Sequence, residues 1–99
     1  MEQNEKNYMY ARKRLFIELI EKGLLEDSQY NGIESITYYQ HNDWEFIRVD
    51  YRHGYTVDIN VTGNSNGANL NELAAEVYGK GAIGRMKKSI EEVIGCELN

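Results

Sequence analysis

Apolar residues recur at helical spacing near both ends of the chain and alternate with polar residues in its middle. The spacing over residues 4–22 predicts an amphipathic helix. Its apolar stripe consists of Tyr8, Ala11, Leu15, Leu19 and Ile20, widened by Phe16 and Ile17. Gly23 follows, and a glycine there favours a helix end because it takes up left-handed backbone without a steric penalty.

The middle of the chain predicts three antiparallel strands over residues 34–40, 45–51 and 55–62. These segments are rich in Ile, Val, Tyr and Thr, which fit a pleated, half-buried surface. The third segment alternates cleanly, with Val57 and Ile59 directed to one side and Asp58 and Asn60 to the other. Such alternation is typical of a sheet with one buried face.

The turn residues fix how these strands pair. A two-residue turn at 42–43 places Tyr38 opposite Ile47, and a three-residue loop at 52–54 with Gly54 left-handed places Val49 opposite Val57. A slip of one residue would send half of the apolar set to the wrong side. Both registers gather one apolar face, made of Ile36, Tyr38, Ile47, Val49, Tyr51, Val57 and Ile59.

The last third of the chain predicts two more helices. After a connector at 63–67, a helix over 69–78 begins with Asn69 as its cap and Glu72 at capping-box spacing. Glycines near residue 80 break it, and a last helix follows over 82–94. The apolar stripe of that last helix is Ile83, Met86, Ile90, Val93 and Ile94. The order α-β-β-β-α-α predicts a two-layer α+β single domain, residues 1–99, in which a three-stranded antiparallel meander packs on helices.

Length and charge narrow the classes of function. The 99 residues suit one domain, and the formal net charge is −5, most of it in residues 28–63. Affinity for nucleic acid comes largely from Lys and Arg, so direct nucleic-acid binding is disfavoured and a larger basic protein is the favoured partner. With one cysteine, no signal-peptide pattern and no long apolar run, we expect a cytoplasmic protein without membrane contact.

Catalytic and metal-binding constellations are missing from the sequence. His41 and His53 fall at opposite ends of the second predicted strand, and Cys96 lies in the tail. Nucleophilic catalysis needs a nucleophile beside an oriented base, and a metal site needs converging ligands. The glycine-containing connector at 63–67 lacks the residues of a phosphate-binding loop and is interpreted as a flexible link. We therefore expect neither an enzyme nor a cofactor or metal.

The sheet face opposite the apolar one is the candidate site. Aromatic side chains Tyr39, Trp44 and Phe46 gather at one corner, and aromatic residues are the usual anchors of binding hot spots. The register also sets Arg48 opposite Asp58 as a cross-strand ion pair. We interpret the corner as a partner-binding face with an acidic rim formed by Asp43, Glu45, Asp50 and Asp58. Two alternatives stay open: burial of the corner beneath the first helix or the tail, and homodimerisation through it.

In architecture the chain resembles small accessory proteins of phages and conjugative elements of low-GC Gram-positive bacteria. It is short, acidic, rich in Tyr and Asn, and lacks proline. Among those proteins it is similar in size, charge and element order to acidic anti-CRISPR proteins, which block Cas9 by imitating DNA. The resemblance implies a non-catalytic inhibitor of a host-defence nuclease, with carboxylates standing in for phosphates.

A different class of function competes with this one. A nucleic-acid-binding accessory protein would use two basic clusters, Arg12-Lys13-Arg14 and Lys87-Lys88, together with aromatic stacking on the sheet. Each cluster has acids at helical spacing, such as Glu18 and Glu91, so local ion pairs on a solvated helix face are the alternative interpretation. A homodimeric structural protein is the third reading.

Overall fold

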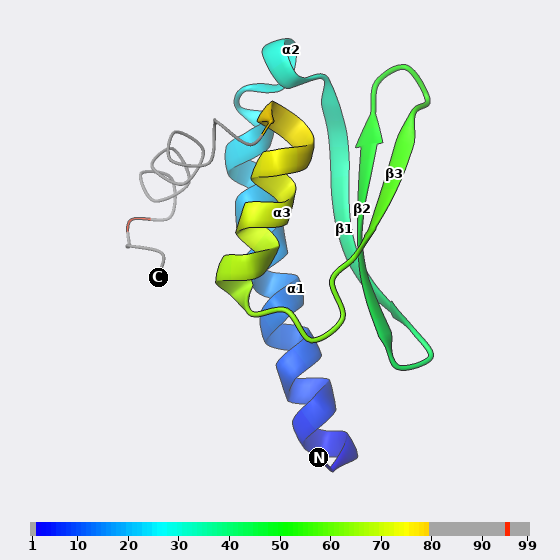
Figure 1. Ribbon diagram of the computed structural model, residues 1–99. Coiled ribbons are helices and arrows are strands. Elements are labelled where there is room, and N and C mark those ends of the chain that lie inside the picture. The colour runs from blue at the N-terminus through cyan, green and yellow to red at the C-terminus, as the bar shows by residue number, and fades with distance from the viewer. Residues whose placement is uncertain (1, 80–94, 96–99) are drawn as a thin grey trace.

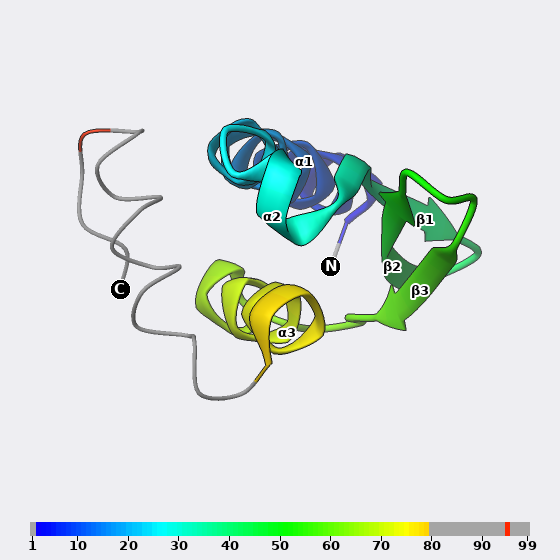
Figure 2. The ribbon, with the colours of Figure 1, turned by 90° about the horizontal axis from the view of Figure 1, so that it is seen from above.

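Three strands and two long helices form two layers. The computed structural model describes residues 2–79 and Gly95. The elements are α1 (Gln3–Leu25), α2 (Ser28–Asn31), β1 (Ile33–His41), β2 (Trp44–Tyr51), β3 (Thr56–Asn60) and α3 (Asn66–Tyr78). The strands form one antiparallel sheet in the order β1-β2-β3, and the helices lie on one side of it (Figures 1 and 2). The predicted α+β class is confirmed, whereas the predicted helix over 82–94 falls outside the described residues.

The strand register follows the turn residues as predicted. Tyr38 lies opposite Ile47, and Val49 lies opposite Val57. The first turn contains Asn42 with a φ of 55°, a left-handed conformation that Asn adopts more readily than most residues. In the second turn Gly54 has a φ of 80°. Both turns therefore fix the pairing through local backbone chemistry.

Helix α1 turns only part of its predicted apolar stripe, Ile17 and Ile20, toward the core. The buried residues of α1 are Lys13, Ile17, Ile20 and Leu24. Two other members of the predicted stripe, Tyr8 and Leu15, are 68% and 58% exposed. The helix also continues through Gly23 to Leu25, so the predicted end was wrong. Apolar residues occupy both sides of this helix, and the side that carries Ile17, Ile20 and Leu24 faces the core.

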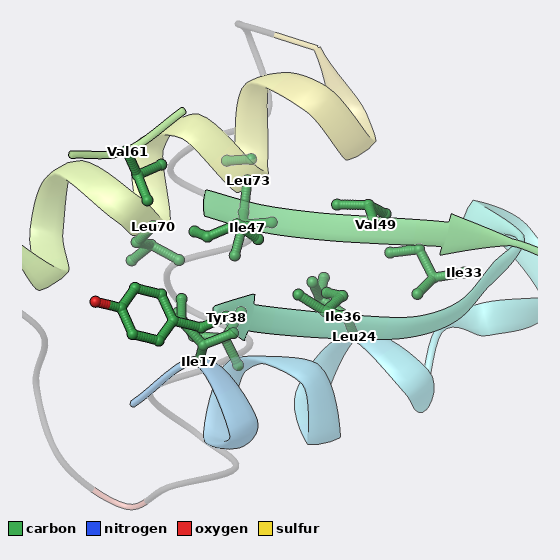
Figure 3. Packing of buried hydrophobic residues seen from close by; sticks show 12 residues of the cluster. Ile17, Leu24, Ile33, Ile36, Tyr38, Ile47, Val49, Val61, Leu70 and Leu73 are labelled. Carbon is green, nitrogen blue, oxygen red and sulfur yellow. The ribbon is translucent and has the colours of Figure 1, made fainter. Parts of the chain in front are cut away.

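The core lies between the sheet and the two long helices (Figure 3). Its buried members are Ile17, Ile20, Leu24, Ile33, Ile36, Tyr38, Ile47, Val49, Val61, Leu70, Leu73 and Ala74. Helix α3 begins three residues earlier than predicted, because Ser65 is its N-cap. The Ser65 hydroxyl oxygen accepts a hydrogen bond from the Ala68 backbone amide at 3.2 Å. Asn69, the predicted cap, lies fully buried within the helix. No helix among the described residues has both the length and the apolar content that a membrane span needs.

The short helix α2 was not predicted, and it ties the helix ends together. The Asn31 side-chain amide donates to the Leu24 carbonyl at 3.0 Å and to the Tyr78 hydroxyl at 3.0 Å. That hydroxyl donates in turn to the Asp27 carboxylate at 2.6 Å. Gly32, with a φ of 73°, ends α2 and leads into β1. The last turn of α3 is thereby fixed beside the C-terminal end of α1.

We expect Ile47→Ala to lower the free energy of unfolding by about 2–5 kcal/mol, the usual cost of such a cavity. Ile47 has no exposed surface and lies in the centre of the core between β1 and α3. Urea denaturation followed by circular dichroism measures the change. Glu18→Ala, at an exposed position of α1, is the control and should cost little. Equal stabilities of the two variants would contradict the described core.

Candidate functional site: the outer face of the sheet

The side of the sheet turned away from the helices carries the predicted site. We call it the outer face. It consists of Thr37, Tyr39, His41, Trp44, Phe46, Arg48, Asp50, Thr56, Asp58 and Asn60. In Figure 2 all three labelled helices lie on the opposite side. Within residues 2–79 no helix or strand covers the outer face, so burial beneath the first helix is excluded.

Aromatic side chains form one corner of the outer face. Tyr39 lies opposite Phe46 in the sheet, and their rings stack with centroids 5.3 Å apart and planes 19° apart. Trp44 lies opposite His41 at the start of β2 and is 55% exposed. Because Tyr39 and Phe46 are half-buried against each other, Trp44 is the member of the group with the most accessible surface. The corner has the composition of a binding hot spot.

An ion pair borders the aromatic corner. The Arg48 guanidinium donates to both Asp58 carboxylate oxygens, at 2.9 and 3.2 Å, as the register predicted. It also lies 5.3 Å from the centre of the Tyr39 ring, whose hydroxyl donates to Asp58 at 3.0 Å. Hydrogen bonding from Arg48 holds the pKa of the Asp58 carboxyl below its ordinary value. The three side chains therefore support one another, and the charge of Asp58 is largely compensated.

The remaining acids of the predicted rim differ in accessibility. The half-buried Asp50 carboxylate accepts hydrogen bonds from the Ser35 hydroxyl at 3.0 Å and the Thr56 hydroxyl at 2.8 Å. The Asp43 side chain is 90% exposed at the β1–β2 turn, 3.8 Å from the Lys6 ammonium. Asp43 is thus the rim carboxylate that projects furthest into solvent, while Asp50 is held within the sheet surface.

Glu45 does not belong to the outer face, contrary to the prediction. Glu45 is only 3% exposed, and its side chain points toward the helices. Its carboxylate accepts hydrogen bonds from the Lys13 ammonium at 2.7 Å, the Tyr38 hydroxyl at 2.6 Å and the Gly63 amide at 2.8 Å. Side chains alternate along a strand, so the pattern that directs Trp44 and Phe46 outward directs Glu45 inward. The sequence contained this signal.

The environment of Glu45 determines its charge. Burial alone would raise the pKa of its carboxyl, but hydrogen bonds from Gly63, Lys13 and Tyr38 outweigh that effect, and the pKa lies below its ordinary value. Burial and the adjacent carboxylate raise the pKa of the Tyr38 hydroxyl. At neutral pH Glu45 is therefore a carboxylate and Tyr38 a neutral phenol.

The basic clusters are divided by the fold. Lys13 is buried against Glu45, the Arg12 guanidinium lies 5.8 Å above the Tyr8 ring, and Arg14 donates to the Gln40 side chain at 3.2 Å. Arg14 thus contacts β1. An Arg14–Glu18 ion pair on the helix face, the alternative interpretation of this cluster, is not among the ion pairs of the described residues. The three consecutive residues do not form one phosphate-binding surface. The Lys87-Lys88 cluster lies outside the described residues.

The glycine-containing connector binds a carboxylate of its own chain. The Gly63 amide is engaged with Glu45, and Ser65 caps α3, so these groups have internal partners. In the part of the chain that the structure describes, no three His, Cys, Asp or Glu side chains are grouped to hold a metal ion. The outer face therefore carries the best-defined arrangement of exposed chemistry in this region.

Comparison with known proteins identifies no relative. No family model, no curated protein and no solved structure matches the chain. The interpretation of the outer face accordingly depends on the geometry and chemistry of its own residues.

The accessibility of Trp44 can be measured directly, since it is the one tryptophan of the chain. We expect red-shifted emission and strong collisional quenching by acrylamide, because more than half of its surface is exposed. The denatured protein supplies the upper limit of quenching. Emission that is blue-shifted and resistant to acrylamide would show that the aromatic corner is covered in solution.

The low pKa of Glu45 predicts a pH dependence of stability. A carboxyl whose pKa is lower in the folded than in the unfolded state stabilises the folded protein. This contribution is complete at pH values above the ordinary pKa of 4.5, and it is lost as the pH falls through the pKa of the folded state. Acid should therefore destabilise the wild type more steeply than Glu45→Gln below about pH 4.5. Denaturant unfolding across a pH series measures the difference, with the exposed Glu18→Gln as control. Identical slopes for wild type and Glu45→Gln would refute the assignment.

Proposed function

We propose that this protein is a non-enzymatic binding module that recognises another protein through the outer face of its sheet. The carrying observation is the exposed corner of Trp44, Tyr39 and Phe46, bordered by the Arg48–Asp58 pair and left uncovered by the described helices. Interface cores are enriched in aromatic residues and Arg, and the corner contains both.

The arrangement of the corner supports tight binding. The stacked rings, the guanidinium above Tyr39 and the bidentate ion pair hold these side chains in place before a partner arrives. Association normally costs about 0.5–1.5 kcal/mol for each flexible side chain that becomes ordered. A surface that is already ordered avoids part of this cost, so Trp44 is the principal side chain left to be fixed.

The charge of the protein supports a basic partner. The net charge of −5 attracts a positive surface at long range, and Asp43 and Asp50 border the corner. Two of the four carboxylates that were expected to imitate phosphates are not free to face a partner, because Glu45 is buried and the charge of Asp58 is compensated by Arg48. We therefore propose that aromatic contact supplies most of the affinity and that charge contributes to the association rate.

Architectural resemblance to anti-CRISPR proteins gives a first partner to test. We propose a larger, basic, nucleic-acid-processing effector, inhibited by occlusion of its nucleic-acid path, and a mobile genetic element as the source of the chain. Direct nucleic-acid binding receives less support, since Lys13 is buried and Arg14 is bonded to Gln40. The first probe is purified Cas9 with its guide RNA.

We expect Trp44→Ala to weaken partner binding by about 30-fold or more, the loss typical of a hot-spot aromatic. Biolayer interferometry with immobilised protein measures binding to Cas9, and capture from a bacterial lysate extends the test to other basic effectors. Tyr30→Ala is the matched control, because Tyr30 is an exposed aromatic on α2, away from the outer face. A partner that binds wild type and Trp44→Ala equally would overturn the proposal, as would a gel shift with nucleic acid alone.

Salt separates the two contributions. Asp43→Asn should lower the association rate and the salt dependence while leaving the dissociation rate nearly unchanged, since exposed charges act mainly on encounter. Stopped-flow kinetics at low and high salt measure both rates. An association rate that is insensitive to salt would contradict the proposed contribution of charge to the association rate. It would not bear on the proposed contribution of aromatic contact to the affinity.

A further inference from the structure

One edge of the sheet carries main-chain groups that the described residues leave without a partner. At one end of the β2–β3 ladder the Tyr55 carbonyl accepts from the Tyr51 amide at 2.8 Å. At the other end the Val61 amide donates to the Glu45 carbonyl at 2.9 Å. In an antiparallel pair alternate residues turn their N–H and C=O groups toward the neighbouring strand, so the even-numbered residues of β3 turn theirs away from β2. We call this row the open edge of β3, and it consists of the amides and carbonyls of Thr56, Asp58 and Asn60.

The opposite edge of the sheet is different, because side chains from the helices close the first half of β1. The Ile36 amide donates to the Glu21 carboxylate of α1 at 2.6 Å. The Ile33 amide donates to the Asn31 side chain of α2 at 2.9 Å. No described residue makes such a bond to the open edge of β3, and in Figure 1 no labelled element lies beyond this strand.

Strand β3 also lacks the features that usually protect an edge. Natural edge strands often carry lysine, proline or a bulge that prevents pairing with another chain. The segment Thr56–Asn60 contains neither lysine nor proline, and its pairing with β2 has no register shift. Its one charged side chain, Asp58, is turned back toward β2 by the ion pair with Arg48 at 2.9 Å. The open edge is therefore a template for a further strand.

We propose that the protein partner adds an extended, positively charged segment to β3 as a fourth, antiparallel strand. The open edge presents an N–H and a C=O at every second residue, about 7 Å apart, and an extended main chain has matching groups at that spacing. Antiparallel pairing is the more stable of the two orientations. Addition of a strand to an exposed sheet edge is a recurring mode of peptide recognition. This inference rests on the proposed function, since the segment belongs to the protein that contacts the outer face.

The side chains of β3 define the sequence that fits beside them. On the side of the helices Val57 and Ile59 are only half-buried, so apolar residues of the added strand would cover them. On the outer face Thr56, Asp58 and Asn60 are polar and exposed, which suits Lys, Arg or Thr in the neighbouring strand. The matching segment therefore alternates apolar residues with basic or polar ones.

Charge favours a basic segment over a second copy of the chain. The net charge of −5 attracts a basic strand and repels another copy. A two-fold pairing of β3 with itself about its middle residue would place Asp58 directly opposite the same residue of the other copy. Like charges in that position destabilise a sheet, so the second copy is the weaker occupant.

The open edge is continuous with the aromatic corner. Asn60 lies opposite Phe46, which stacks on Tyr39 of the next strand. A segment on β3 therefore extends the row that contains these two rings, on the face where Trp44 is exposed. Main-chain pairing at the edge and aromatic contact at the corner thus form one continuous interface.

A synthetic peptide tests the proposal directly. The probe is a short peptide in which lysine and valine alternate, and the control has the same composition with the lysines and valines in two separate blocks. With saturating probe, amide exchange followed by NMR should slow on the order of tenfold at Thr56, Asp58 and Asn60, because these amides become hydrogen-bonded. The amides of Val57 and Ile59, which already face β2, should change little.

Substitution of Thr56 supplies a second test. Thr56→Pro removes one amide of the open edge, and proline is tolerated where the N–H of an edge strand faces solvent. It should weaken binding of the alternating peptide on the order of tenfold, because a carbonyl of the peptide then lacks its donor. Thr56→Val loses the hydroxyl that bonds to Asp50 but keeps the amide, so this matched control should bind like the wild type. Circular dichroism checks that both variants fold.

Three results would overturn strand addition. They are unchanged exchange at the open edge in the presence of the probe, equal binding of the alternating and block peptides, and protection that appears with rising protein concentration alone, which would assign the edge to a second copy. Failure of the proposed function gives a different result. Loss of partner capture in Trp44→Ala but not in Thr56→Pro leaves the outer face and overturns strand addition, whereas undiminished capture by Trp44→Ala, with exchange slowed at the edge, overturns the role of the aromatic corner alone.

Discussion

The buried contact between Lys13 and Glu45 is the constraint on which the arrangement of layers depends. It joins α1 to β2, and the same carboxylate holds the Tyr38 hydroxyl of β1 and the Gly63 amide of the connector to α3. A buried charge without partners costs several kcal/mol, so competing arrangements that separate these groups are penalised. The contact therefore selects which side of α1 meets the sheet, whatever its net contribution to stability.

The outer face follows from that choice. With Glu45 held inward, its neighbours Trp44 and Phe46 must point outward, and the register brings Tyr39 against Phe46. The Arg48–Asp58 pair then occupies the next row of the same face. One interaction within the core thus has two effects: it orients the helix layer, and it leaves an ordered aromatic corner in contact with solvent.

Sequence reasoning recovered what local chemistry decides. The strand register and the Arg48–Asp58 pair were predictable because the turn residues and the two-residue alternation act over a few positions. The orientation of α1 was not, because apolar residues occupy both of its sides and the deciding partner of Lys13 lies 32 residues away in sequence. Glu45 lies inward rather than on the rim, as its position in the two-residue alternation already predicts.

The exposed apolar side chains of α1 and those of the outer face differ in chemistry. The exposed side of α1 carries Leu15 and Leu19, whose side chains have no polar atoms. The outer face combines aromatic rings with charged groups that remain hydrogen-bonded whether a partner is present or not. A mixed aromatic and polar face can exist both in solvent and in a complex, as reversible recognition requires.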